Sequence, residues 1–258
     1  MTPETNSDVH GESSLGLVLV HGSELGAWLW DSVLARLSRP AVAVDLPGRG
    51  AKPADRRTLR LEDAVQSVVD DVSGWGTRPA ILVVHSFAGV LAPAIVAGLA
   101  GRVRAVAWVG ATVPVEGRSW AHELPPVQRL MLRLLYRVRP SGALSPRAEN
   151  RKLLLHDVEE SVAEQLLDRR VPEVPRFLLD PVRCAKMPDE VPSHFVRLLE
   201  DRAQTHADRE RYIARLPDVR VHDLNSGHLP MLSQPGPFAA LLDRIADGHE
   251  ERPSASRH

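Results

Sequence analysis

Ser86 stands where a reactive serine can be held, at the junction of a predicted strand and a predicted helix. The apolar run from Ile81 to Val84 has the length of a fully buried parallel strand, and small residues and a second apolar stretch follow the serine. A serine on such a sharp turn has strained backbone geometry, and its hydroxyl projects above the sheet with a helix N-terminus behind it. This position favours nucleophilic attack. The same pattern also fits a serine in an ordinary loop, so the rest of the chain must decide.

The residues around Ser86 resemble the nucleophile elbow of the α/β-hydrolase fold, whose usual form is Gly-x-Ser-x-Gly. Val84 and Ala88 stand where the two glycines are usual, and a glycine follows one position later, at Gly89. Glycines serve the elbow by letting helix and strand pack closely around a residue with unfavourable dihedral angles. Val84 is the larger departure, because it puts a β-branched side chain beside the tightest part of the turn.

The loop after the first predicted strand, Leu15 to Val20, contains His21, Gly22 and Ser23. In the α/β-hydrolase family, a His-Gly pair at this place shapes the loop whose backbone N–H helps to form the oxyanion hole. The resemblance implies that Ser23 N–H is one donor and that Phe87 N–H, just after the nucleophile, is the other. The alternative is that the His-Gly pair only makes a turn.

One of the two places where the α/β-hydrolase fold can carry its catalytic acid follows the predicted strand Val103 to Val109, and no carboxylate stands there, so the resemblance implies an acid later in the chain. Asp201 and His228 each follow a later predicted strand, and a Gly-His pair after the last strand is where the family keeps its catalytic histidine. The resemblance therefore implies a triad of Ser86, Asp201 and His228, in the family's order of nucleophile, acid and base. Glu200 competes with Asp201, because side chains alternate along a strand and only one of two neighbours can face the histidine.

The remaining apolar segments predict an α/β chain, a mostly parallel sheet flanked by helices. Further strands are expected at residues 41–45, 194–199 and 219–224, and helices at residues 31–37, 61–75, 203–216 and 237–245. An α/β-hydrolase core would then occupy residues 15–114 and 192–247. Residues 1–14 and 248–258 are polar and are expected to be disordered tails.

Between residues 115 and 191 the strand-helix alternation is lost, and a helical insert is expected. Its first helix combines an apolar stripe (Val127, Leu130, Met131, Leu134, Leu135) with arginines at a spacing of four (Arg129, Arg133, Arg137). An insert here resembles the cap of many α/β-hydrolases, which implies that the stripe lines a largely apolar substrate pocket. Residues 116–152 hold eight Arg or Lys against three Glu, either a solvated surface or a docking patch for an anionic carrier or a carboxylate substrate.

The overall composition restricts the classes of partner. The 258 residues have a net charge of -1 and are 43% apolar, which favours neither nucleic acid nor membrane as a partner. The single cysteine, Cys184, excludes an intrachain disulfide and a cysteine-based metal cluster. The polar N-terminus does not resemble a secretion signal, and no apolar run approaches 18 residues, so a cytoplasmic location is expected. A monomer or a homodimer is expected.

The resemblance is to small cofactor-free serine esterases and the similar hydroxynitrile lyases. It implies hydrolysis of a carboxylic ester, thioester or lactone of a small to medium, largely apolar substrate through an acyl-enzyme on Ser86, without metal or organic cofactor. Trp28, His85 and Leu229 are the expected substrate contacts, with a core position as the alternative for Trp28. A serine nucleophile argues against the dehalogenases and epoxide hydrolases of this fold, which use an aspartate. A lyase or cyclase stays open, although Leu229 stands where hydroxynitrile lyases have a lysine, and so does a non-catalytic ligand receptor.

Overall fold

The computed structural model describes residues 14–99 and 101–250, and its centre is a six-stranded sheet whose neighbouring strands all run parallel. The strands are β1 (Gly16–Val20), β2 (Ala41–Val44), β3 (Ala80–His85), β4 (Val103–Val109), β5 (Ser193–Leu198) and β6 (Arg220–Leu224). Their order across the sheet is β2-β1-β3-β4-β5-β6, so β3 lies inside it, between β1 and β4. The predicted α/β class with a parallel sheet is confirmed.

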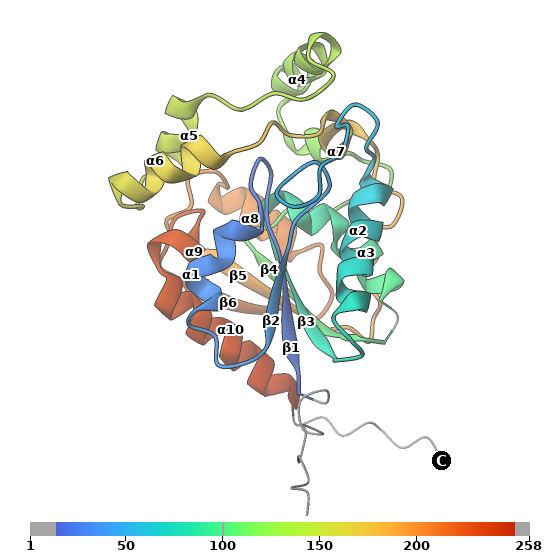
Figure 1. Cartoon of the computed structure of the whole chain (residues 1–258), viewed down its shortest axis with the longest axis vertical. Coiled ribbons are helices and arrows are strands. Elements are labelled where there is room, and N and C mark those ends of the chain that lie inside the picture. The colour runs from blue at the N-terminus through green and yellow to red at the C-terminus, as the bar shows by residue number, and fades with distance from the viewer. Residues whose placement is uncertain (1–13, 100, 251–258) are drawn as a thin grey trace, which may run out of the picture.

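Helices cover both faces of the central strands, which explains why these strands are built mostly from apolar residues. β1 and β3 are buried along their whole length. On one face, α2 (Leu61–Gly74) and α3 (Ala92–Gly98) pack against the sheet and share one hydrophobic core with it. On the other face, α1 (Asp31–Leu34) and α10 (Pro235–Glu250) form a second core (Figure 1). The other core helices are η1 (Ala27–Trp30) and η2 (Ser86–Leu91), both of the 3-10 type, α8 (His206–Ile213) and α9 (Pro230–Ser233).

The closing helix α10 is longer than the predicted 237–245. It begins at Pro235, because the fixed φ of proline suits the first turn of a helix. Its last turn packs against β5, where a ring nitrogen of His249 lies 2.8 Å from one of His194. Residues 248–250 are therefore helical, and their assignment to a tail was wrong. The other predicted tail residues, 1–13 and 251–258, lie outside the described residues.

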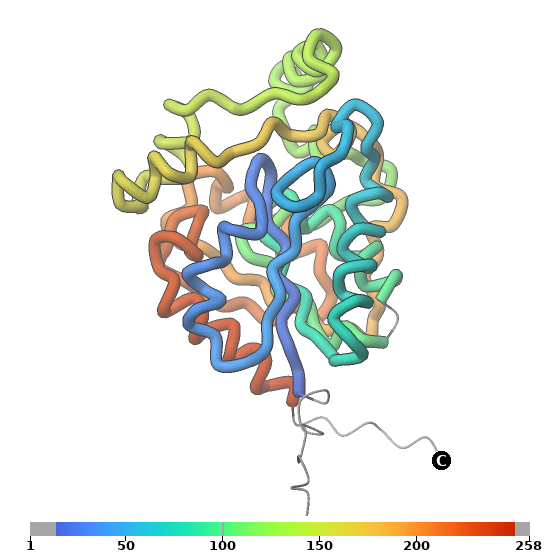
Figure 2. Tube along the Cα trace, viewed as in Figure 1, coloured from blue at the N-terminus to red at the C-terminus, as the bar shows by residue number. Residues whose placement is uncertain are grey.

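The insertion, residues 115–191, lies over the carboxyl ends of the strands (Figure 1). It contains η3 (Trp120–Glu123, 3-10), α4 (Pro126–Val138), α5 (Arg147–Leu153), α6 (Glu160–Arg169) and α7 (Pro175–Leu179). Figure 2 traces the chain from β4 out to α4, the outermost element, and back through α5, α6 and α7. The start of β1 and the end of α10 lie at the opposite end of the molecule.

The predicted apolar stripe of α4 faces away from the rest of the chain. Its five residues are exposed, whereas Tyr136 is buried and Leu132 packs against the core on the opposite side of the helix. The expectation that the stripe lines an internal pocket was therefore wrong. Helical periodicity identified the stripe correctly. The side of α4 that packs against the core is, however, the opposite one, which carries Leu132 and Tyr136.

Candidate active site

Ser86 directly follows β3 and has a φ of +53°, in the left-handed region that side-chain-bearing residues rarely adopt. η2 begins at this residue, so the strand turns sharply into a helix, as the sequence predicted. The close approach that demands glycine occurs at Gly89, where a Cβ would lie 2.2 Å from the carbonyl oxygen of Thr112. Val84 and Ala88 are fully buried in the core, so packing accommodates both departures from the usual motif.

The structure brings Ser86, His228 and Asp201 into one hydrogen-bonded series. Ser86 Oγ lies 3.0 Å from His228 Nε2, and His228 Nδ1 lies 2.8 Å from Asp201 Oδ2. The other carboxylate oxygen accepts the backbone N–H groups of Ala203 at 2.7 Å and Gln204 at 3.1 Å. Burial raises the pKa of Asp201, but the facing imidazole and these two donors outweigh it and hold the pKa below its usual value. Asp201 is therefore ionised and directs the Nδ1 proton toward itself.

The two neighbouring carboxylates have different surroundings. Asp201 is buried beside the histidine, whereas Glu200 is exposed. The buried guanidinium of Arg209 donates from Nη1 to the carbonyl oxygens of Asp201 at 3.3 Å and Gln204 at 2.8 Å. The loop that carries the aspartate is thus held from both its side chain and its backbone, and Arg209 was not predicted as part of the site.

His85 is hydrogen-bonded to the backbone of His228. Its Nε2 donates to the carbonyl oxygen of His228 at 3.0 Å, and its ring meets Trp30 edge to face with 6.4 Å between centroids. Burial first, and the neighbouring His228 second, lower the pKa of His85 to about 3, so this imidazole is neutral near pH 7. Its side chain is only 1% exposed, and its contacts in the structure are with protein. Its predicted contact with substrate stays a prediction.

The other two predicted substrate contacts also have protein neighbours. Trp28 is half-buried, and the guanidinium of Arg169 from α6 lies over its ring, 4.3 Å from the centroid. Leu229 is fully buried and belongs to the core that lies under α10. Of these residues, Trp28 is the one that the structure leaves partly exposed.

The loop after β1 lies directly against the serine. A Cβ on Gly22 would come within 3.0 Å of Ser86 Cβ, so the absence of a side chain there permits the approach. Ser23 follows in this loop, and Phe87 lies in the first turn of η2, where N–H groups have no acceptor within the helix. The two predicted oxyanion donors therefore come from segments that flank Ser86, and their role stays a prediction.

A buried ion pair between Arg49 and Glu173 holds the loop after β1. Arg49 Nη1 donates to the carbonyl oxygens of Gly22 at 3.2 Å and Leu25 at 3.1 Å, and Glu173 accepts the N–H of Glu24 at 3.0 Å. Both side chains of the pair are at most 1% exposed, and Glu173 comes from the insertion. Sequence reasoning missed this pair, because an arginine in a Pro-Gly-rich turn normally indicates a solvated surface.

The insertion also contacts the loop that carries the histidine. Asp157, between α5 and α6, accepts the backbone N–H of Gly227 at 2.6 Å. Gly227 immediately precedes His228, so this contact fixes the backbone from which the histidine extends. No local pattern points to Asp157, because its partner lies 70 positions away along the chain.

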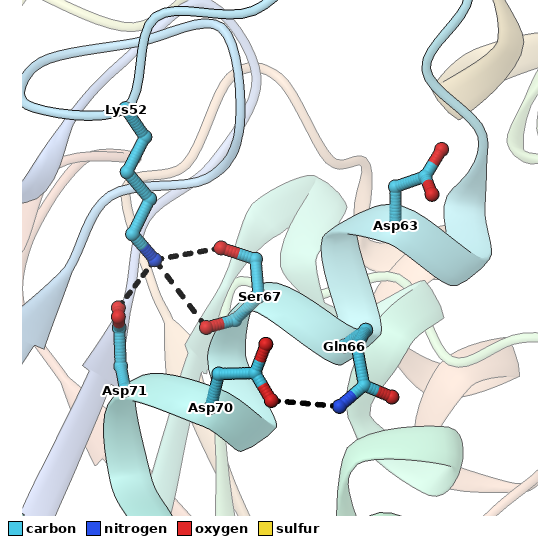
Figure 3. Close-up of a pocket in the computed structure, with 6 residues that line it drawn as sticks. All are labelled: Lys52, Asp63, Gln66, Ser67, Asp70 and Asp71. Carbon is cyan, nitrogen blue, oxygen red and sulfur yellow. Dashed lines mark hydrogen bonds and ion pairs between the residues drawn. The ribbon is translucent and has the colours of Figure 1, made fainter. Parts of the chain in front are cut away.

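A separate polar hollow lies on α2 (Figure 3). Lys52 reaches across it and donates to Ser67 Oγ at 2.6 Å and to Asp71 at 2.5 Å. The remaining lining residues are Asp63, Gln66 and Asp70, so the hollow contains none of the predicted site residues. Because its lysine is already engaged with protein groups, the hydrogen-bonded series at Ser86 is the better candidate for chemistry.

The family model described as "Alpha/beta hydrolase family" matches residues 17–241. "Methylesterase 17" of Arabidopsis thaliana is 24% identical over 249 residues, which cover 89% of this chain and 90% of that protein. "Probable esterase PIR7A" of Oryza sativa subsp. indica is 27% identical over 258 residues, which cover 89% of this chain and 95% of that protein. Among solved structures, an extracellular alpha/beta-hydrolase from a Paenibacillus species superposes with a TM-score of 0.80 at 20% identity, covering 89% of this chain and 98% of that one.

Proposed function

Because the chain belongs to the alpha/beta-hydrolase family, we propose that it is a serine esterase acting on a small to medium, largely apolar carboxylic ester. The observation that carries the proposal is the hydrogen-bonded series from Ser86 through His228 to Asp201, at the carboxyl ends of three parallel strands. The similarity to a methylesterase and to a probable esterase supports the reaction class.

In the proposed reaction, Ser86 Oγ attacks the ester carbonyl carbon while His228 Nε2 takes the hydroxyl proton. Asp201 stabilises the imidazolium that forms and keeps Nδ1 as the donor. The N–H groups of Ser23 and Phe87 donate to the carbonyl oxygen as it becomes negative. The bond to the alcohol oxygen then breaks, and the alcohol leaves with the proton from His228.

A water molecule completes the proposed cycle. His228 takes one of its protons while the water oxygen attacks the acyl carbon, and the acid leaves as the proton returns to Ser86 Oγ. A thioester or a lactone would follow the same steps, with a thiol or an internal alcohol as the leaving group. The half-buried ring of Trp28 is the proposed apolar contact for such a substrate.

Leu229 favours hydrolysis over the lyase alternative. The hydroxynitrile lyases that the sequence resembles have a lysine after the catalytic histidine, whereas Leu229 is fully buried in the core and supplies no charge to the site. Mandelonitrile-type cyanohydrins are therefore expected to be poor substrates. Rapid cyanide release without ester hydrolysis would reverse this choice.

A fluorophosphonate probe tests the nucleophile. The full-length protein should be labelled at Ser86, and a panel of esters, thioesters and lactones of graded chain length should include substrates that turn over. Ser86→Ala should lose both labelling and turnover, and Ser73→Ala, which changes an exposed serine on α2, is the control and should keep both. Absence of an adduct on Ser86, under conditions that label a known serine esterase, would favour the ligand-receptor reading.

A further inference from the structure

α4 concentrates the exposed apolar surface of the described chain. Six of its residues are large, apolar and exposed: Val127 at 69%, Leu130 at 58%, Met131 at 64%, Leu134 at 52%, Leu135 at 37% and Val138 at 77%. They form one broad arc centred opposite Leu132 and Tyr136, the residues through which α4 contacts the body. A contiguous exposed apolar face of this kind marks an interaction surface.

An arginine row borders this arc. Arg129, Arg133 and Arg137 follow one another at a spacing of four along one flank, and α4 contains no acidic residue. The preceding carboxylate in the chain, Glu123, is already paired with Arg211 and Arg215. The surface therefore needs an occupant that offers hydrocarbon to the arc and negative charge to its flank.

We propose that α4 docks the protein on the surface of an anionic lipid bilayer. An apolar helical face bordered by arginines fits the boundary between acyl chains and negatively charged headgroups. At 13 residues the helix is about 20 Å long, too short to cross a bilayer, so it lies along the surface. Within the described residues no helix combines the length and apolar character needed to span a membrane.

The position of α4 gives the docking a direction. It is the outermost element at the end of the molecule where the strands reach Ser86, and the start of β1 and the end of α10 lie at the other end (Figures 1 and 2). Docking through α4 turns the candidate active site toward the lipid. The net charge of -1 argued against a membrane partner, but that value averages over the chain and hides the local charge of α4.

A second copy of the chain is a poorer occupant. It would offer an apolar face of the same kind, but it would bring three more arginines and no acidic residue on α4. A soluble anionic carrier would neutralise the arginines of α4. It would leave the apolar arc exposed to water unless it also had an apolar groove. An anionic bilayer supplies both chemistries at once.

Co-sedimentation of the full-length protein with vesicles tests the proposal. Binding should be strong to phosphatidylcholine mixed with phosphatidylglycerol, weak to phosphatidylcholine alone, and reduced when salt rises from about 0.1 M to about 1 M. Met131→Asp should weaken binding to the mixed vesicles at least about tenfold, and the pair Arg133→Gln with Arg137→Gln should weaken it several-fold. Val221→Asp, an exposed apolar residue on β6, is the matched control and should bind like the original protein.

Three outcomes would overturn the proposal. The first is no binding to the mixed vesicles at low salt. The second is binding that the arginine changes abolish and Met131→Asp leaves intact, because the arc would then not enter hydrocarbon. The third is a dimer by analytical ultracentrifugation that Met131→Asp dissociates, without vesicle binding, which would assign the face to a second copy. Vesicle binding is measured without turnover. If the protein proved not to be an esterase, the binding result would therefore still test the docking proposal.

A soluble short-chain ester supplies an activity readout. If esterase activity is present, Met131→Asp should leave KM for such an ester unchanged, because the arc faces away from the site. A several-fold higher KM would place Met131 on the substrate's path and contradict a lipid-facing arc.

Discussion

Around Ser86 the polar groups are buried and bonded to one another, whereas α4 turns its apolar groups outward and leaves its arginines at the surface. Both regions lie at the same end of the molecule. The loops at the site are fixed by contacts such as Arg49 with Glu173 and Asp157 with Gly227, each joining the core to the insertion. α4 packs against the core through Leu132 and Tyr136.

The insertion therefore contains two regions that differ in their physical chemistry. Its inner residues set the geometry of the loops around the serine, where low exposure makes each polar contact costly to lose. Its outermost helix offers a surface whose residues can change with little effect on folding. We therefore expect substitutions of the buried residues near Ser86 to have large effects on activity or stability, and matched substitutions of exposed residues to have small ones.

The largest expected effect comes from the acid beside the histidine. Asp201→Asn should lower kcat/KM for a turned-over ester at least roughly 100-fold, because the amide no longer holds the imidazole in its working tautomer. The exposed neighbour is the control, and Glu200→Gln should cost less than about tenfold. Circular dichroism should first show that both variants fold. If Glu200→Gln were the crippled enzyme, the two roles would be exchanged and the esterase proposal would survive.

The buried ion pair should dominate stability. Glu173→Gln leaves the guanidinium of Arg49 buried without a counter-charge, so the free energy of unfolding should fall by about 3 kcal/mol. Urea denaturation measures the change. The matched control is Asp55→Asn, which breaks a surface pair with Arg57 and should have no measurable effect. Equal losses in the two variants would remove the distinction between inner and outer contacts.

Asp157 should affect rate more than folding. Asp157→Ala removes the acceptor of the Gly227 N–H and loosens the loop of His228, so kcat should fall about tenfold with a small change in KM. Asp157→Asn keeps an oxygen acceptor and should retain most of the activity. Steady-state kinetics on one ester decide the matter, with exposed Asp168→Ala on α6 as control. An equal loss in the Asn and Ala variants would indicate that the charge matters, rather than the hydrogen bond.

A smaller effect is the pH dependence of stability that arises from two buried histidines, His194 and His85. Burial lowers the pKa of His194 to about 3, with further lowering by His249 and His222, and burial lowers the pKa of His85 to a similar value. Their ordinary pKa is 6.5, so between pH 6.5 and 3 the unfolded chain binds more protons than the folded one. Stability should therefore fall as the pH falls through this window, by about 1 kcal/mol per pH unit for each histidine.

Urea titrations at several pH values test this slope. His194→Gln should reduce the loss of stability between pH 6.5 and 5 without changing the activity at pH 7.5, because His194 lies at the amino end of β5, whereas Ser86 follows the carboxyl end of β3. An unchanged slope would mean that the chain of imidazoles from His222 through His194 to His249 does not resist protonation.

The sequence predicted elements that depend on neighbours along the chain. The apolar run before Ser86 fixed the position of β3, and the strands that precede Asp201 and His228 were also correctly found. Contacts between distant segments could not be predicted in this way. The apolar stripe of α4 has the same periodicity whether it packs inward or faces outward, so its direction was wrong. Arg49 with Glu173 gave no local pattern.

The places where β1 begins and α10 ends matter when the protein is immobilised. β1 begins and α10 ends at the end of the molecule opposite α4 and the site (Figure 1). An affinity handle, a fluorescent protein or a solid support joined directly before β1 or directly after α10 would be attached at the end of the molecule opposite the site. Immobilised through such a handle, the catalyst would present the same face to every incoming substrate, and arrays of it would behave as an oriented layer.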